Sequence, residues 1–269
     1  MTETWDDDLA LALELADLAD RITMAHFRAT DLKVETKPDR SPVTEADRAV
    51  ESGLWEHVAA ARPGDGRYGE EFGSTGELVD RCWILDPIDG TANYLRGVQV
   101  WATLIALVVD GEPVIGVASA PAMGRRWWAS PEGAHTSDVD GTSRPLGVSG
   151  VAQLSDASVS YSDDIGWDAH PGGLDLLRAL AWRTRGFGDF WSHLLVAEGS
   201  VDVAVEPVLK PWDVAALLPI VTRAGGRLTG LDGSAALRLV DGDFSVPDGA
   251  LTTNGHLTEA AVELLSDPG

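Results

Sequence analysis

The spacing of apolar side chains predicts two helices within the first sixty residues. Between residues 6 and 27, apolar side chains recur near the helical repeat of about 3.6 residues, at Leu9, Leu13, Ala16, Ile22 and Phe27. Residues 6–8 are all aspartate, and negative charge at the start of a helix complements the helix dipole. A second helix is predicted over residues 45–61, because Ser-Pro-Val-Thr precedes it and Pro-Gly follows it.

The period then changes from helical to extended. The apolar run Cys82–Leu85 predicts a buried strand, and Pro87 predicts that this strand ends at Asp86-Pro87. Residues 103–109 and 113–118 predict two further strands, joined by a hairpin turn at Asp110-Gly111. Residues 101–128 as a whole therefore indicate a meander of strands.

The second half of the chain alternates between helical and extended segments. Helices are predicted at residues 173–181, 191–198, 213–224 and 256–265, and short strands at 201–205, 227–229 and 250–253. No repeat or long linker divides the chain. We therefore expect one mixed α/β (α+β) domain over residues 1–269, β-rich to about residue 150 and alternating from about 151 to 269.

The composition is that of a globular protein with a strongly acidic surface. The 269 residues carry a net charge of −23, and 44% are hydrophobic. This charge repels nucleic-acid backbones and anionic membranes, so we expect neither as a partner. Cys82 is the single cysteine, which excludes an intramolecular disulfide. The acidic N-terminus and the lack of an apolar run near 18 residues predict a cytoplasmic protein.

The most informative motif follows the buried strand, at Asp86-Pro87-Ile88-Asp89-Gly90-Thr91. Carboxylate oxygens are the ligands that Mg²⁺ prefers, and a strand end followed by a turn could aim both aspartates at one ion. The backbone N–H groups of Gly90 and Thr91 would open a helix and could bind a phosphate. Taken alone, the motif is also compatible with a structural Asx turn.

Three further carboxylates accompany the motif. Glu70 lies 16 residues before Asp86 at a predicted strand end, Asp47 lies in a first helical turn, and Asp213 follows Trp212 at another helix start. Each has an ordinary interpretation: Asp47 as a helix-terminal charge and Asp213 as an N-cap. Their occurrence together, in this order, favours a shared site.

Taken together, the segments Thr44–Asp47, Gly69-Glu70-Glu71, Asp86–Thr91 and Trp212–Ala216 resemble the inositol monophosphatase family. The resemblance extends to Glu198-Gly199 and Ala224-Gly225-Gly226 and so covers most of the chain. It implies a layered α-β-α-β-α sandwich and Mg²⁺-dependent hydrolysis of a small-molecule phosphate monoester, by direct in-line attack of a metal-activated water. It also implies a homodimer.

The resemblance assigns roles by position. The metal ligands, for two or three Mg²⁺ ions, are Glu70, Asp86, the Ile88 carbonyl, Asp89 and Asp213. Asp47 and Thr91 are the pair that orients the attacking water, with Thr91 donating to Asp47, and Glu70 is counted with them as catalytic. Gly90 and Thr91 form the phosphate cradle. Lys37 corresponds to a basic residue of the family's entry loop.

The identity of the substrate depends on two more acids. Aligned on the family, Glu206 contacts substrate hydroxyl or amine groups, and Asp189 stands where inositol-specific members carry a small apolar residue. A pair of acids attracts a cation, and histidinol phosphate carries an ammonium and an imidazole. Asp189 is also compatible with a helix N-cap.

Segments 121–129 and 186–190 resemble the actinobacterial histidinol-phosphate phosphatase branch. We therefore expect hydrolysis of L-histidinol phosphate to L-histidinol and phosphate, a step of histidine biosynthesis. The alternatives are an inositol-1-phosphate phosphatase on the same scaffold and, outside enzymes, an inactive acidic metal-binding homologue.

Overall fold

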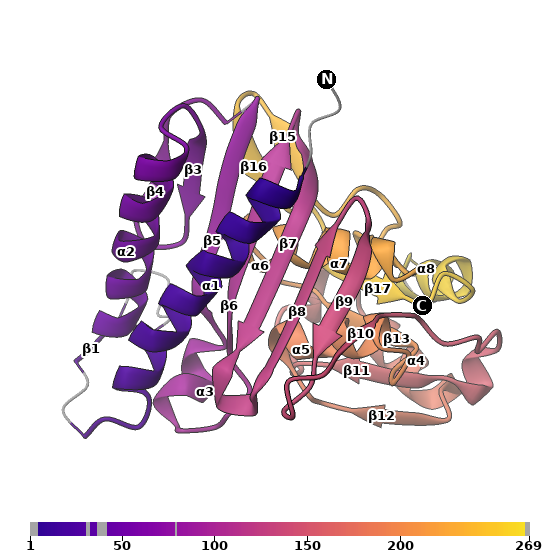
Figure 1. Ribbon diagram of the computed structural model, residues 1–269. Helices are drawn as coiled ribbons and strands as arrows, with labels where there is room; N and C mark the ends of the chain where they lie inside the picture. Colours follow the sequence, from indigo (N-terminus) through magenta and orange to yellow (C-terminus); the bar gives the residue numbers. More distant parts are fainter. Residues whose placement is uncertain (1–4, 31–32, 37–41, 79, 267–269) are drawn as a thin grey trace.

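The computed structural model describes residues 5–30, 33–36, 42–78 and 80–266, which stack as five layers of helix and sheet (Figure 1). The first layer holds α1 (Asp6–His26) and α2 (Glu45–Ala61). Leu15 of α1 and Leu54 of α2 are buried against Trp83 and Ile105 of the sheet behind them. Both helices therefore form as predicted, because each places one apolar face on that sheet.

The second layer is an eight-stranded sheet. Its strands are, in spatial order, β10 (Ser143–Pro145), β9 (Gly133–Ser137), β8 (Arg125–Ser130), β7 (Glu112–Ala120), β6 (Ala102–Val109), β5 (Arg81–Asp89), β3 (Gly66–Gly69) and β4 (Gly73–Thr75). The predicted hairpin at Asp110-Gly111 joins β6 to β7, and both turn residues adopt positive φ. Only β3 and β5 run parallel, so the segment after β3 and the end of β5 meet at one edge.

The third layer consists of helices between the two large sheets: α5 (Asp189–Ala197), α6 (Pro211–Ala215) and α7 (Leu217–Arg223). The prediction of one helix over 213–224 was wrong on two counts. The helix begins at Pro211, and it divides after Ala215. Pro219 has no N–H to donate to the Ala215 carbonyl, which explains the division.

The fourth and fifth layers complete the sandwich. The five-stranded sheet runs β12 (Arg183–Arg185), β11 (Ser158–Tyr161), β13 (Val203–Glu206), β17 (Ala250–Thr253) and β14 (Arg227–Thr229). Helices α4 (Gly173–Leu180) and α8 (Thr258–Ser266) cover its outer face. The layered α-β-α-β-α sandwich is thus confirmed.

The remaining elements are short. The β1 (Val34–Thr36) and β2 (Pro42–Thr44) pair precedes α2, α3 (Thr91–Leu95) follows β5, and β15 (Arg238–Val240) pairs with β16 (Asp243–Ser245). Within the described residues, every helix is too short or too polar to cross a membrane.

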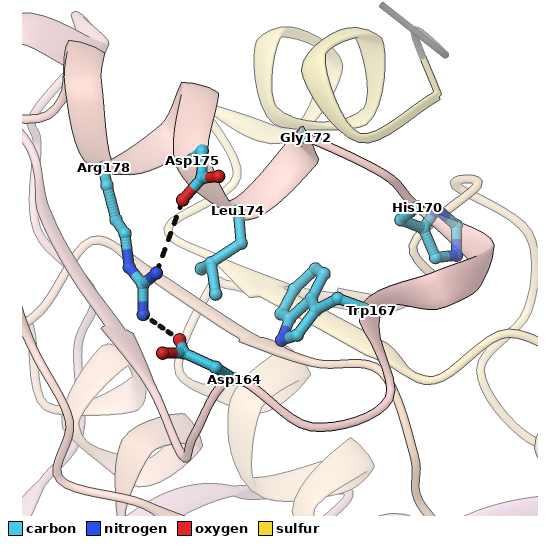
Figure 2. A pocket seen from close by; sticks show the side chains of 7 residues that line it. All are labelled: Asp164, Trp167, His170, Gly172, Leu174, Asp175 and Arg178. Carbon is cyan, nitrogen blue, oxygen red and sulfur yellow. Dashed lines mark hydrogen bonds and ion pairs between the residues drawn. The ribbon is translucent and has the colours of Figure 1, made fainter.

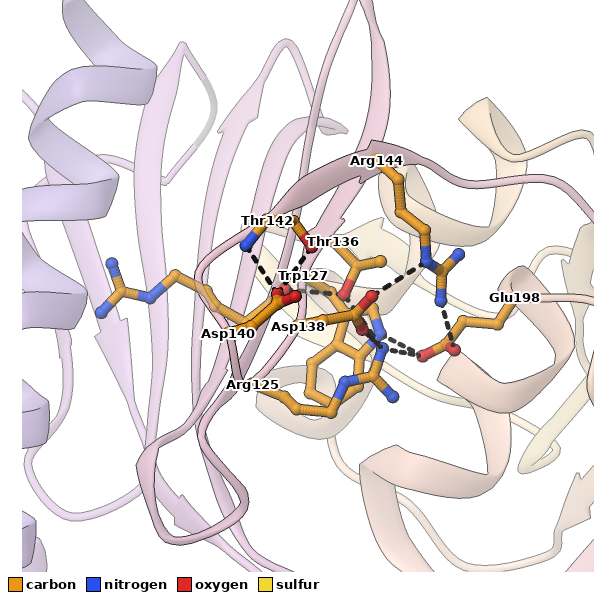
Figure 3. A network of polar contacts seen from close by, with 9 residues as sticks. Arg125, Trp127, Thr136, Asp138, Asp140, Thr142, Arg144 and Glu198 are labelled. Atoms are coloured by element: carbon orange, nitrogen blue, oxygen red, sulfur yellow. Dashed lines mark hydrogen bonds and ion pairs between the residues drawn. The ribbon is translucent and has the colours of Figure 1, made fainter.

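A polar network joins the first sheet to the C-terminal end of α5 (Figure 3). Glu198, directly after α5, accepts from Trp127 Nε1 at 2.6 Å and pairs with Arg125 and Arg144 at 3.0 Å each. Asp138 of the β9–β10 turn pairs with both arginines in turn. Because α5 carries Asp189 at its other end, this network fixes the far end of a helix that reaches the candidate site.

Candidate active site

The end of β5 presents two aspartates across a bulge. In the β5–β6 ladder Asp86 pairs with Leu104 and Asp89 with Ala102, so three steps on β5 match two on β6. The prediction that the strand ends at Pro87 was therefore wrong: the bulge accommodates the missing N–H, and the Pro87 carbonyl accepts from Thr103 Oγ1 at 2.7 Å. The bulge also turns Asp86 and Asp89 toward the same side, where Asp86 Oδ1 accepts from Ile88 N at 2.9 Å.

Asp213 joins these two aspartates from α6. Carboxylate oxygens of Asp86, Asp89 and Asp213 all lie within 4.8 Å of one another. Asp213 is the third residue of α6 and not its N-cap, and its Oδ2 accepts from Lys210 N at 2.7 Å. One oxygen of Asp213 therefore fixes the helix start, while the carboxylate also reaches the cluster.

Burial and mutual repulsion make the cluster costly to ionise. Burial is the largest cause that raises the pKa of Asp86 and Asp89, and neighbouring carboxylates raise both further. Burial likewise raises the pKa of Asp213 to about 7, with the Glu70 charge adding to it and the Lys210 backbone bond opposing it. A bound cation would remove this repulsion, and an all-oxygen donor set of this kind fits a hard divalent ion.

Asp47 is the third residue of α2 and forms a capping box with the N-cap Thr44. Its Oδ2 accepts from the backbone N and the hydroxyl of Thr44, at 2.8 and 2.6 Å, and Thr44 caps the helix in return. Its Oδ1 is buried and has no hydrogen-bond partner in the structure. The pKa of Asp47 is raised to about 6, chiefly by burial and in smaller part by the Glu70 and Glu71 charges, while the hydrogen bonds from Thr44 oppose the shift.

The hydroxyl of Thr91 has a different partner from the one predicted. Thr91 Oγ1 donates to the Ile88 carbonyl at 3.0 Å and not to Asp47. This bond places the Thr91 hydroxyl beside one predicted metal ligand and leaves its lone pairs to accept from a water. The Ile88 carbonyl keeps a second lone pair.

Glu70 lies directly after β3, in a turn fixed by a buried acid of α2. The carboxylate of Glu51 accepts from Glu71 N at 2.8 Å, Phe72 N at 3.0 Å and Trp55 Nε1 at 3.0 Å. Glu70 lies within electrostatic range of Asp47, because its charge raises the pKa of that group. Glu70 also interacts with Asp86 through its charge and a side-chain hydrogen bond, so the structure brings it to the cluster.

The two predicted substrate-binding acids meet through a serine. Glu206 is the last residue of β13, and its carboxylate accepts a hydrogen bond from Ser162 Oγ. Ser162 Oγ in turn accepts from the backbone N–H of Asp189 at 3.0 Å. Burial, together with the Asp189 charge, raises the pKa of Glu206 to about 8, and burial, together with the Asp163 charge, raises the pKa of Asp189 to about 6. The N-cap interpretation of Asp189 was wrong, because Gly188 is the N-cap of α5 and Asp189 its first residue.

Gly90 connects the two acid groups. It caps α3 with φ of +83°, a conformation that favours glycine. A Cβ there would lie 3.0 Å from the Val100 carbonyl and 3.2 Å from Asp189 Oδ2. The predicted phosphate cradle therefore lies beside the predicted substrate acid, with no room for a larger residue at Gly90.

A separate hollow of about 280 Å³ lies at the start of α4 (Figure 2). Its lining includes Arg178, whose guanidinium pairs with Asp164 and, at 3.5 Å, with Asp175. None of the predicted site residues lines this hollow.

The chain was compared with known protein families, curated proteins and solved structures. Residues 5–267 match the model of the inositol monophosphatase family. The chain belongs to that family. It is 51% identical to histidinol-phosphatase from Mycobacterium tuberculosis over 97% of this chain and 98% of that protein. It is 55% identical to histidinol-phosphatase from Streptomyces coelicolor over 84% and 88%.

A solved inositol monophosphatase from Zymomonas mobilis superimposes with a TM-score of 0.83 at 31% identity, covering 98% of this chain and all of that one. This family consists of phosphoric monoester hydrolases, so the predicted enzyme class is confirmed. Lys37, assigned from the family's entry loop, lies outside the described residues.

Sequence reasoning missed the residues that support the acids. Thr44 carried a usable signal, because Thr-x-x-Asp is a capping-box pattern. Glu51 follows Asp47 by one helical turn, which also places it on the same face. Asn93 and Ser162 carried no such signal, since their partner Asp189 is 96 residues from Asn93.

Proposed function

We propose that this protein is a Mg²⁺-dependent histidinol-phosphate phosphatase. The observation that carries the proposal is the position of a second acid pair, Asp189 and Glu206, beside the Asp86–Asp89–Asp213 cluster. A phosphate monoester held by a cation at the cluster would direct its alcohol part toward that pair. The identity to two histidinol-phosphatases, above half in both cases, supports the same substrate.

The predicted ligands fit the metal. We assign Glu70, Asp86, the Ile88 carbonyl, Asp89 and Asp213 to hold two or three Mg²⁺ ions. When bound, Mg²⁺ neutralises phosphate charge and lowers the pKa of a coordinated water. The oxygen-only donor set supports this assignment, and so do the burial and the carboxylate repulsion that raise the pKa of Asp86.

The chain's own residues would then align the reaction. The unpaired Oδ1 of Asp47 is a buried acceptor suited to a hydrogen bond from the attacking water. The Thr91 hydroxyl donates to the Ile88 carbonyl, so its oxygen is free to accept from that water as well. Two acceptors fix the direction of the water's remaining lone pair, which favours in-line attack on phosphorus. Gly90 and Thr91 offer backbone N–H groups to the phosphate.

The acid pair selects the alcohol. Asp189 and Glu206 together attract an ammonium or imidazolium group, whereas a neutral polyol gains only hydrogen bonds. An inositol-1-phosphate phosphatase remains the alternative on this scaffold. The two differ in how much binding depends on the Asp189 charge.

We further propose one domain that assembles as a homodimer. Helices α5 and α7 pack between both large sheets, which supports one folding unit. Strand β12 forms an edge of the second sheet, and Trp182 and Leu180 beside it are 68% and 48% exposed. Exposed apolar side chains at a sheet edge favour an interface.

The substitution Asp189→Ala tests the proposed substrate. It should raise KM for histidinol phosphate by roughly tenfold or more, since one charge-assisted contact is lost. Asp164→Asn, which alters an exposed carboxylate of the hollow in Figure 2, is the matched control and should leave KM unchanged. An unchanged KM in Asp189→Ala would favour the inositol phosphate alternative.

A further inference from the structure

The carboxylate of Asp189 is held from a distant element. Asn93 of α3 donates its side-chain amide to Asp189 Oδ2 at 2.8 Å and to the Val100 carbonyl at 2.9 Å. Both amide hydrogens of Asn93 are therefore used, one on the acid and one on the loop that follows α3. This arrangement ties Oδ2 of Asp189 to α3 and does not use Oδ1.

The backbone of Asp189 is fixed as firmly as its side chain. Its φ is +51°, a left-handed conformation that is unfavourable for a residue other than glycine. Its N–H donates to Ser162 Oγ at 3.0 Å, and the N–H of Phe190 donates to Asp89 Oδ2 at 2.8 Å. Three separate elements thus converge on residues 189 and 190. A strained residue held in this way is typical of a functional position.

The contact also has a direction. The Asn93 amide nitrogen donates to Asp189 Oδ2, and a carboxylate oxygen is a strong acceptor for such a donor. Ser162 bridges from Asp189 to Glu206 in the same network. The two acids therefore share one framework, with Asn93 at one end and Ser162 in the middle.

We infer that Asn93 is a positioning residue for substrate specificity, which holds Asp189 Oδ2 so that Oδ1 meets the cationic group of the substrate's alcohol part. This inference rests on the proposed function, because it takes Asp189 as the acid that contacts that group. It assigns to Asn93 an effect on the alcohol part of the substrate and none on the phosphate.

A purely structural role makes a different prediction. The Asn93 side-chain amide also donates to the Val100 carbonyl at 2.9 Å, so it supports the loop after α3 as well. Loss of that support alone would disturb Gly90 and Thr91 of the same segment and would weaken phosphate binding. The two halves of the substrate must therefore be measured separately.

Isothermal titration calorimetry on the Mg²⁺-loaded protein separates them. L-histidinol, which lacks phosphate, reports the acid pair, and inorganic phosphate reports the metal side. Asn93→Ala should raise the Kd for L-histidinol by roughly tenfold, the loss of about one charge-assisted hydrogen bond. Its Kd for phosphate should stay within about twofold of the wild type. Gln99→Ala is the matched control, because its amide donates to the Ala122 carbonyl at 2.7 Å and touches neither acid.

A double variant tests the route of the effect. In an Asp189→Ala background, Asn93→Ala should raise the Kd for L-histidinol no further. If Asn93→Ala does not fold, Asn93→Ser, which retains one donor, is measured in its place and should show a smaller change of the same kind.

The outcomes are distinct. Equal weakening of both ligands, or no change in either, would overturn the role of Asn93. Failure of the wild type to bind L-histidinol while it binds phosphate would overturn the proposed function.

Discussion

Replacement of Glu51 by glutamine should destabilise the turn that carries Glu70. The Glu51 carboxylate is fully buried and accepts three N–H donors, two from the backbone of Glu71 and Phe72 and one from Trp55. A glutamine keeps one oxygen, so its amide must face at least one of these donors. At least one charge-assisted hydrogen bond is lost and one donor becomes unpaired.

The magnitude follows from that count. A hydrogen bond to a charged group contributes about 1.5–3 kcal/mol, and an unpaired buried donor sets the loss near the upper end. We therefore expect Glu51→Gln to lower the free energy of unfolding by about 2–3 kcal/mol, or the melting temperature by roughly 5–10 °C for a chain of this size. Glu51→Ala removes all three acceptor contacts and should cost more.

The same change should reach the metal. Because Glu71 N is held by Glu51, the position of Glu70 next to it depends on that bond. Loss of such a supporting contact typically weakens metal affinity by about 10–100-fold. Differential scanning calorimetry without metal and calorimetric titration with Mg²⁺ measure the two effects. Glu56→Gln, on the exposed side of α2, is the control.

A Glu51→Gln protein that melts within about 1 °C of the wild type would refute this reasoning. So would an unchanged Mg²⁺ affinity in a destabilised variant, because the buried carboxylate would then support the fold and not the site.

Three further predictions concern single residues. Gly90→Ala should reduce kcat for phosphate release far more than it lowers stability, since its Cβ would press on the Val100 carbonyl at 3.0 Å; equal loss of both would contradict this. Burial lowers the pKa of His193 to about 4 in the folded protein, whereas in the unfolded chain it is about 6.5. As pH falls, the unfolded chain is therefore protonated at this histidine before the folded protein, and the free energy of unfolding decreases between about pH 6.5 and pH 4. Between pH 7 and pH 4.5, the free energy of unfolding measured in urea should decrease by about 2–3 kcal/mol less in His193→Gln than in the wild type. An equal decrease in both proteins would count against this prediction. Glu198→Ala should cost about 2–3 kcal/mol, because it leaves Trp127 Nε1 without an acceptor and removes one of the two carboxylates that Arg125 and Arg144 share; Glu198→Gln should recover part of this in the same denaturant assay, and no recovery would count against it.

Much of the fold could be predicted because it depends on local periodicity. Helices α1 and α2 and strands β14 and β17 have the predicted bounds or nearly so. The errors lie where a proline meets tertiary context. Pro87 could remain within β5 because a bulge absorbed it, and Pro219 divided a helix that the apolar pattern alone made continuous.

In the site, too, residues of one short segment could be predicted, whereas contacts between distant elements could not. Asp86 and Asp89 could be paired from sequence because both lie on one short segment, and Asp213 joins them through the fold. The contact between Asn93 and Asp189 joins α3 to α5, and no local pattern encodes it. The predicted bond from the Thr91 hydroxyl to Asp47 was wrong, because the hydroxyl donates instead to the Ile88 carbonyl, three residues earlier in the chain.

Release of inorganic phosphate, measured with Mg²⁺ and with EDTA, tests the central claim most directly. The substrates are histidinol phosphate, inositol-1-phosphate and a nucleotide bisphosphate. The account predicts a Mg²⁺-dependent rate that strongly favours histidinol phosphate and is lost in EDTA. A preference for inositol-1-phosphate would contradict the roles given to Asp189 and Glu206, and release that persists in EDTA would contradict the metal site itself.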